Sequence, residues 1–314
     1  MRQRIVNGTI TTITENNHVF NALESNLSFS ANNTVDEIGV ENGVSYGDPD
    51  FNNLKTIKRI KYLYLIFFID ENHKGRLMIS ESAQTRLKNI KRKPWYDDKT
   101  HQAFCIPLQS VDEIIEQVSL ILKKHTTTKV EAQIKEIGFF SHSGGDGPIS
   151  YNKENKICPL PSYSGQMDIC GWEKIKAVWS TDSKFVFYGC NTANTSANWN
   201  NFAKNISKLS NFSNVKVWGQ STSSFPSFYP NFRVTSVARS VGDNGFGWNT
   251  RANTYQVAGN AGQGSKAISY RPNKDTLDDA TLASSGHPKA NPLNIYKNGT
   301  LENSSHQGIF NNHR

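Results

Sequence analysis

The chain has 314 residues, of which 36% are hydrophobic, and its formal net charge is +8 at pH 7. This length is long for one domain and short for three, so we expect one large domain with appendages, or two domains. The longest apolar run, residues 62–69, is far shorter than the roughly 20 residues that a membrane helix needs, so we expect no membrane span. The N-terminus shows no apolar segment of a secretory signal peptide, so we expect any export to use another route.

The positive charge raises the hypothesis of a nucleic-acid partner. Much of the excess lies in residues 55–61 and 86–93, which flank predicted elements and mix basic with apolar side chains. Such a mixture is typical of a solvated helix face or the start of a strand. We therefore regard a nucleic-acid partner as the weaker hypothesis.

The chain alternates predicted strands and helices between residues 54 and 232. Residues 110–125 carry the strongest helix signal, with Ser110 and Glu113 as a capping box and a basic last turn. Strands are predicted at residues 62–70, 101–108, 134–141, 184–189 and 215–218, and helices at residues 80–91, 110–125, 171–180 and 196–209. This order predicts the α/β class: a three-layer α/β/α sandwich with a mostly parallel sheet of about five or six strands.

The two flanks differ from this region in composition. Residues 1–53 are rich in Asn, Thr, Gly and Ser, and we expect a string of short strands or a leader without fixed structure. Residues 233–314 are rich in Gly, Asn and Ser. There we expect an irregular extension that packs on the sheet edge, followed by a mobile tail from about Leu282.

Four cysteines without a CxxC pair argue against a disulfide framework and against a cysteine-type zinc site. Cys105 lies in an apolar strand, where a cysteine is usually a small buried hydrophobe. Cys158 and Cys170 lie in a polar connection, where a chance disulfide or no role at all is the simplest interpretation. Only Cys190 occupies a position that indicates chemistry.

Two apolar strands end at reactive side chains. Residues 134–141 lead into His142 and a glycine-rich loop, and residues 184–189 lead into Cys190. If the two strands are parallel neighbours, both side chains lie at the carboxyl edge of the sheet, where open α/β sheets bind their ligands. A thiol and an imidazole at that edge are the minimum for nucleophilic acyl transfer. The structural alternatives are a buried cysteine at a strand end and a loop histidine that caps a turn.

The pattern resembles a known family. A hydrophobic strand that ends in Ser-His, followed roughly 50 residues later by one that ends in a small residue and Cys, is similar to the caspase-like cysteine peptidases. These include caspases, legumains, gingipains and the autoprocessing domains of large bacterial toxins. The likeness rests on residues 137–147 and 185–195 and covers about residues 60–230. It implies a cysteine endopeptidase with Cys190 as nucleophile, His142 as general acid for the leaving amine, and no cofactor or metal.

The resemblance also implies an oxyanion hole and a substrate cleft. Many family members have Gly directly after the histidine, whereas here Ser143 precedes Gly144. The backbone N–H of Cys190, with that of Ser143 or Gly144, would then hold the oxyanion. The segment after the fifth strand corresponds to the cleft wall, which would be formed by Gln220, Ser221, Thr222 and Ser223.

Two further expectations concern the charges at the site. Cys190 would lie near the amino end of the predicted helix 196–209, whose dipole would lower the thiol pKa. The sequence shows no obvious third carboxylate for the site.

The N-terminal leader, through Val-Ser-Tyr-Gly-Asp-Pro at residues 44–49, resembles the β-rich leaders of effectors carried by bacterial contractile injection machines. This likeness implies a toxin that is made in the bacterial cytoplasm and exported into a target cell by a type VI-like secretion system. Its partners would be a protein substrate, a spike or tube protein of the machine, and a cognate immunity protein.

Two alternatives stay open. His142 and Asp146, with His125 or His101, could ligate a metal in a nuclease or other hydrolase, and the net charge would then attract phosphates. The chain could also be a caspase-like module that only binds a partner.

Overall fold

The computed structural model describes residues 58–71, 76–150, 165–196, 200–234, 237–239, 246–248, 253–259 and 279–308. The chain divides into two compact units, Met1–Lys55 and Thr56–Arg314, and all described residues belong to the second. The predicted leader, residues 1–53, lies outside them. No helix among these residues has the length and apolar character needed to cross a membrane.

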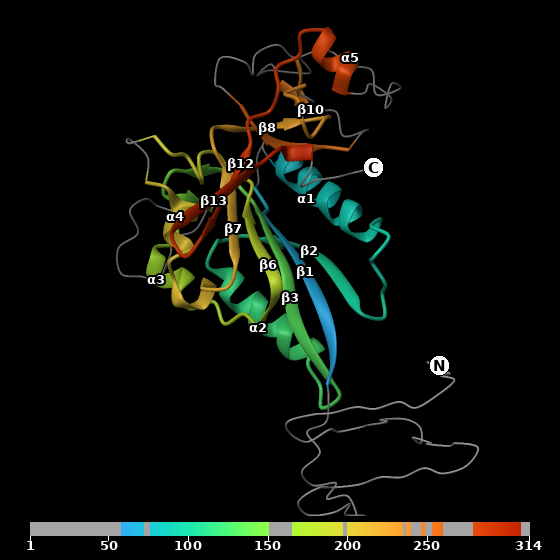
Figure 1. Cartoon of the computed structure of the whole chain (residues 1–314), viewed down its shortest axis with the longest axis vertical. Helices are drawn as coiled ribbons and strands as arrows, with labels where there is room; N and C mark the ends of the chain where they lie inside the picture. The colour runs from blue at the N-terminus through green and yellow to red at the C-terminus, as the bar shows by residue number, and fades with distance from the viewer. Residues whose placement is uncertain are drawn as a thin grey trace, which may run out of the picture. The chain divides into compact units, whose positions relative to one another are not determined.

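A seven-stranded sheet forms the centre of the second unit, in the order β13-β12-β7-β6-β3-β1-β2 (Figure 1). The five strands from β2 to β7 are parallel, and β12 and β13 are antiparallel additions at one edge. Their bounds are β1 (Arg59–Ile69), β2 (His101–Leu108), β3 (Val130–Phe140), β6 (Trp179–Phe187), β7 (Lys216–Gln220), β12 (Leu293–Lys297) and β13 (Thr300–Ser305). The predicted α/β class with a mostly parallel sheet is confirmed, with seven strands instead of five or six.

Helices cover both faces of this sheet (Figure 1). On one face lies α1 (Arg76–Lys91), and on the other lie α2 (Glu113–His125), α3 (Ile169–Trp172) and α4 (Phe202–Ile206). Alternate residues of β1 enter the two layers, because successive side chains of a strand point to opposite faces. Leu65 and Phe67 join the core under α2, whereas Ile66 and Phe68 join the core under α1.

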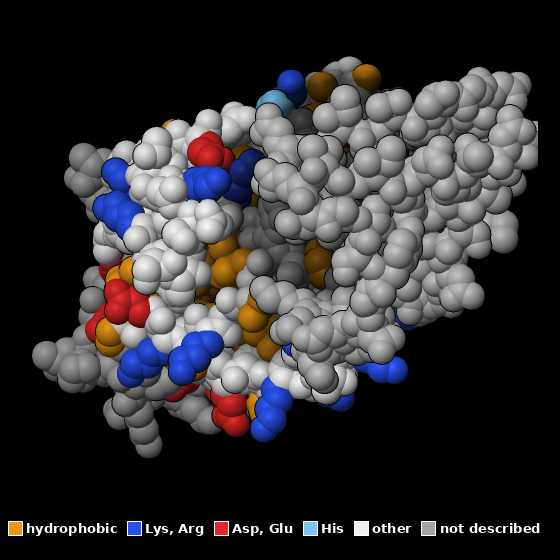
Figure 2. Space-filling model, turned by 60° about the horizontal axis from the view of Figure 1, so that its bottom comes forward, with side chains coloured by type: hydrophobic (Ala, Val, Ile, Leu, Met, Phe, Trp, Pro, Cys, Tyr) orange, Lys and Arg blue, Asp and Glu red, His pale blue; other side chains and the backbone are white. Residues whose placement is uncertain are grey.

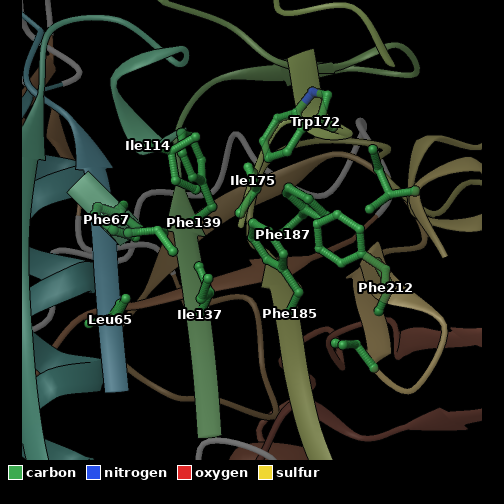
Figure 3. Close-up of a cluster of buried hydrophobic side chains, with 14 of the residues drawn as sticks. Leu65, Phe67, Ile114, Ile137, Phe139, Trp172, Ile175, Phe185, Phe187 and Phe212 are labelled. Atoms are coloured by element: carbon green, nitrogen blue, oxygen red, sulfur yellow. The ribbon is translucent and has the colours of Figure 1, made fainter. Parts of the chain in front are cut away.

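The core under α2 is rich in aromatic rings (Figure 3). The ring centroid of Trp172 lies 5.4 Å from that of Phe187, with the two rings edge to face, and 6.1 Å from that of Phe139. All three side chains are fully buried, and burial of such a side chain stabilises the fold by about 1.5–3 kcal/mol. This packing fixes the ends of β3 and β6, from which the residues of interest project.

The helices deviate from the predicted ranges. The helix predicted from Ser110 begins at Glu113, because the Ser110 hydroxyl donates to the side chain of Asp112 instead of capping the helix. The predicted helix at 171–180 is limited to α3, and Trp179 already belongs to β6. The helix predicted at 196–209 is only five residues long, and the 3-10 helix Ser210–Phe212 follows it.

The C-terminal part of the chain contributes to the main sheet. β12 pairs with β7 through Leu293 opposite Gln220, and Leu293, Ile295 and Tyr296 are buried. The prediction of a mobile tail from Leu282 is therefore wrong for these residues, which belong to the same sheet as the predicted 54–232 domain.

Small elements complete the unit: the hairpin β4 (Ser143–Gly144) and β5 (Gly147–Pro148), the pair β8 (Ser224–Ser227) and β11 (Tyr255–Ala258), the pair β9 (Val237–Arg239) and β10 (Phe246–Trp248), and α5 (Asp279–Ser284).

Candidate active site

The chain brings His142 and Cys190 to the same edge of the sheet. β3 and β6 are parallel neighbours, and the Tyr188 N–H donates to the Phe139 carbonyl at 3.0 Å just beyond the last strand pair. The connections that follow are in contact, because a Cβ placed on Gly189 would lie 2.3 Å from the Cβ of Ser143. Only glycine fits at position 189 without a shift of the loop that carries His142.

His142 is held by a carboxylate from a third strand. Its Nε2 lies 3.5 Å from Oε2 of Glu71, which follows β1 directly. Glu71 is 1% exposed, whereas the His142 side chain is 47% exposed. The close approach of the Glu71 carboxylate and its negative charge raise the pKa of His142 above its ordinary value, although burial opposes this shift. The carboxylate thus orients the ring and favours the imidazolium.

The thiol of Cys190 contacts the backbone at the start of β8. Its Sγ accepts a hydrogen bond from the Ser224 N–H at 3.2 Å and lies 3.5 Å from the Ser224 carbonyl, to which the thiol donates. Burial raises the pKa of Cys190, while the Ser224 N–H and the positive charge of Arg233 counteract the rise. Arg233 is held with its guanidinium carbon 3.9 Å from the ring centroid of Phe225.

The expected effect of a helix dipole on Cys190 is wrong. A turn follows the cysteine, Asn191 has a left-handed φ of 57°, and α4 begins only at Phe202. The net shift of the thiol pKa is upward, because desolvation outweighs the stabilising contacts. The upward shift favours the neutral thiol over the thiolate in the resting protein.

The turn after Cys190 is anchored to the end of β7. The Asn191 N–H donates to the Thr222 carbonyl at 3.0 Å, and the Ala193 N–H donates to the Gln220 carbonyl at 2.9 Å. The Thr192 hydroxyl accepts from the Gln220 N–H at 3.0 Å. These bonds hold the cysteine in a fixed orientation, as a nucleophile requires.

The residues predicted for the oxyanion hole lie on either side of this contact. Ser143 and Gly144 are half-buried in the β4–β5 hairpin, which the Ile149 N–H closes by donating to the His142 carbonyl at 2.9 Å. The contact of Ser143 with Gly189 places this hairpin beside the backbone of Cys190. The assignment of Ser143, Gly144 and Cys190 to an oxyanion hole stays a prediction.

The predicted cleft wall has one member that is unsuited to bind a substrate. Gln220 is fully buried; its amide donates to the Gln256 carbonyl at 3.0 Å and accepts from Gln307 at 2.7 Å. This residue supports the framework, and we do not carry it forward as a substrate contact.

The other three members of the wall are partly exposed. Ser221 donates to the Pro292 carbonyl at 2.8 Å, and Thr222 accepts from Asn291 at 3.1 Å. Ser223 is half-buried. Their role as substrate contacts stays a prediction.

The ligand set of the metal hypothesis is not assembled. Within the described ranges, no three His, Cys, Asp or Glu side chains are grouped so that they could hold a metal ion. The proposed ligands instead contact other groups. The ring centroid of His101 lies 5.5 Å from that of Trp95, and the ring centroid of His125 lies 5.4 Å from that of Phe104. The carboxylate of Asp146 accepts a hydrogen bond from the Asn200 amide at 3.0 Å.

The surface charge is also dispersed where it can be seen. In Figure 2, the visible Lys and Arg side chains form several separate groups with acidic side chains among them. This arrangement offers no single basic patch on the visible part of that face.

Glu71 and Arg233 are the two site residues that the sequence analysis missed. Glu71 had a signal, since it belongs to an acidic pair directly after the first apolar strand. Arg233 had none, because only the packing of its segment against β8 brings it near Cys190.

Comparisons with known proteins give distant structural likenesses. No family model matches the sequence, and no curated protein matches it. Among solved structures, the chain is similar to a secreted C11 cysteine protease from Bacteroides thetaiotaomicron, solved with an irreversible peptide inhibitor. The identity is 12%, the TM-score is 0.35, and the match covers 52% of this chain and 49% of that one, about half its length. A likeness of this degree assigns neither residues nor an activity.

Proposed function

We propose that the protein is a cysteine endopeptidase with Cys190 as nucleophile and His142 as the group that moves the proton. The observation that carries the proposal is the junction of three adjacent parallel strands, β1, β3 and β6, where a buried carboxylate, an imidazole and a thiol follow one another. Such a series, in which a third group orients the base beside the nucleophile, is the general arrangement of nucleophilic catalysis.

The mechanism follows from the protonation states. The resting thiol favours its neutral form, so it must lose its proton to His142 as the sulfur attacks the substrate carbonyl carbon. The imidazolium, stabilised by Glu71, then returns that proton to the leaving amine as the C–N bond breaks. Water hydrolyses the remaining thioester, and the free thiol and the imidazole are restored. Backbone N–H groups of Cys190 and of Ser143 or Gly144 would stabilise the oxyanion; such a donor typically contributes about 100-fold to 1,000-fold in rate.

The test compares two free thiols. Cys170 is in a disulfide, whereas Cys105 and Cys190 are free. Cys105 is the control, because burial raises its pKa to about 12. The reaction with iodoacetamide at neutral pH should modify Cys190 faster than Cys105, and His142→Ala should slow the modification of Cys190 alone, as measured by mass spectrometry.

Activity gives the second arm. Cleavage of a denatured-protein or peptide-library substrate should disappear in Cys190→Ala and persist in Cys105→Ala. Cleavage that persists in Cys190→Ala, with the fold intact, would contradict the proposal.

We extend the proposal to delivery: the protein acts as a toxin that a type VI-like machine exports from a bacterial cytoplasm into a target cell. The support is the resemblance of residues 44–49 to effector leaders. Expression of the chain inside susceptible bacteria should arrest their growth, and Cys190→Ala should abolish the arrest. A toxic Cys190→Ala variant would instead favour a module that acts by binding.

A further inference from the structure

A polar pocket of about 470 Å³ lies where three segments meet: the turn that follows β6, the start of α4, and the hairpin of β12 and β13. In the fold, α4 packs beside β12 (Figure 1). The volume of the pocket falls within the range of about 300–1,000 Å³ that is typical of small-molecule sites. Its lining is rich in short side chains that carry an amide or a hydroxyl: Asn194, Thr195, Ser196, Asn200, Asn201 and Asn205.

A series of hydrogen bonds orients two of these amides. The Asn200 amide donates to the Asp146 carboxylate at 3.0 Å and accepts from the Asn205 amide at 2.8 Å. The Asn205 amide in turn accepts from Lys208 Nζ at 3.4 Å. The stem of Lys208 is packed against the hairpin, since a Cβ placed on Gly299 would lie 2.8 Å from Lys208 Cγ. The two amides therefore have fixed orientations before any ligand binds.

A third amide is fixed at the start of α4. The Asn201 side chain accepts from the Lys204 N–H at 3.0 Å and donates to the Tyr296 hydroxyl at 2.7 Å. Tyr296 is buried in the main sheet, so this bond ties the start of α4 to the core. Side chains that are ordered in advance lose less entropy when a ligand binds.

Each of the three amides keeps capacity for a ligand. An amide has two N–H donors and an oxygen that can accept two hydrogen bonds. In the contacts above, each amide donates once and accepts once, which leaves it one donor and one acceptor. The hydroxyl of Thr195, an exposed residue, adds to this set. A sugar hydroxyl both donates and accepts, so neighbouring hydroxyls of a sugar match such groups.

The pocket also carries positive charge. Lys204 and Lys208 line it, and its described lining includes no Asp or Glu. Lys204 forms no ion pair within the described part of the chain. Leu301, which is 47% exposed, adds an apolar contact at the same pocket. The lining thus suits a ligand that combines hydroxyls, an apolar C–H face and a negative charge.

We propose that this pocket binds a uronic acid unit of a glycan. The sugar hydroxyls bind the three amides and the Thr195 hydroxyl, and the carboxylate binds Lys204 and Lys208. An inorganic anion leaves the amides unused, and a neutral sugar leaves the two lysines without a counter-charge. The site contains neither His142 nor Cys190 and does not rest on the proposed peptidase activity.

The test is titration of the full chain with digalacturonic acid by calorimetry, with maltose and glutarate as partial probes. Digalacturonate should bind with a dissociation constant below about 1 mM, and each partial probe should bind at least about fivefold more weakly. Asn200→Ala should weaken the binding of digalacturonate and maltose and leave that of glutarate unchanged. Lys204→Gln should weaken digalacturonate at least about fivefold and leave maltose unchanged.

The controls separate this result from folding and from the peptidase. Lys91→Gln, at an exposed position of α1 on the opposite face of the sheet, should bind digalacturonate as the wild type does. Thr195→Val is the second hydroxyl-binding variant if Asn200→Ala lowers the unfolding temperature, and it should also weaken digalacturonate and maltose. Cys190→Ala should retain full affinity, so failure of the peptidase assay leaves this test intact. Absence of saturable digalacturonate binding, or equal affinity for digalacturonate and either partial probe, would overturn the proposal.

Discussion

β3 and β6 carry two pairs of polar side chains, and the two pairs have opposite environments. Glu136 and Lys184 lie opposite each other in mid-sheet, whereas His142 and Cys190 follow the carboxyl ends of the same strands, roughly 20 Å away at about 3.3 Å per residue. Glu136 is 1% exposed and paired with Arg86, but His142 is 47% exposed. The buried Glu136 carboxylate has its charge compensated by Arg86 and by the partly exposed Lys184, while the His142 side chain is open to solvent. The position of a polar residue along the strand, more than its type, therefore decides whether it forms a structural ion pair in mid-sheet or stands exposed at the sheet edge.

The largest effect is expected from Arg86→Met, which would break the mid-sheet pair. The variant removes the cation that contacts both oxygens of the buried Glu136 carboxylate and leaves Lys184 at 3.7 Å, and loss of one partner of a buried pair costs about 3–5 kcal/mol. Denaturant unfolding would measure the loss. Lys88→Met, at an exposed position of the same helix, is the matched control and should change stability by less than about 0.5 kcal/mol.

The pH dependence of stability should follow from the same pair. Burial alone would raise the pKa of Glu136, but the charges of Arg86 and Lys184 outweigh it, and the pKa lies below its ordinary value. A lowered folded-state pKa gives stability that is present above the unfolded pKa and is lost as the pH falls through the folded pKa.

An equal loss of stability for Arg86→Met and Lys88→Met would contradict the importance of the pair.

The edge pair should respond to Glu71→Gln by a change in catalysis. Without the carboxylate, the pKa of His142 falls and the ring loses its orienting partner, so peptidase activity should drop at least about tenfold. The acid limb of the pH–rate profile should move to lower pH, because His142 must be neutral to accept the thiol proton and its lowered pKa keeps it neutral to a lower pH. Asp70→Asn, at the neighbouring residue, should keep the wild-type profile, and an unshifted profile in Glu71→Gln would show that Glu71 does not act on His142.

The smallest effect is expected from Arg233→Met. Arg233 lowers the pKa of the Cys190 thiol, so its removal should raise that pKa and slow alkylation by iodoacetamide severalfold at a given pH. Arg233→Lys keeps the charge and should react almost as the wild type does. The pH dependence of the alkylation rate measures the shift; identical curves for the Met and Lys variants would contradict an electrostatic role.

The sequence predicted the central strands and the edge pair because those signals are local. β1 is apolar over residues 62–69 and β3 ends in the apolar run 137–140, and His142 and Cys190 each follow an apolar run after one small residue. The positions of Glu71 and Arg233 depend on contacts between distant segments, which no local pattern records. The helix after Cys190 was overestimated, since α4 begins only at Phe202 and Asn200 before it donates to Asp146 of the loop between β4 and β5. β12 and β13 were missed because they are short and their residue types are mixed.

The strand order has one more consequence, for the solubility of the chain. β2 and β13 are the two edge strands of the sheet, and the unpaired backbone N–H and C=O groups of an edge strand can pair with another molecule. β2 carries Pro107, which has no N–H to offer, and β13 is short and polar, with Glu302 and Asn303 exposed. A protease cut before Leu293 would strip both protective strands from β7 and expose its backbone. The shortened protein would then be prone to join other copies along that strand and aggregate.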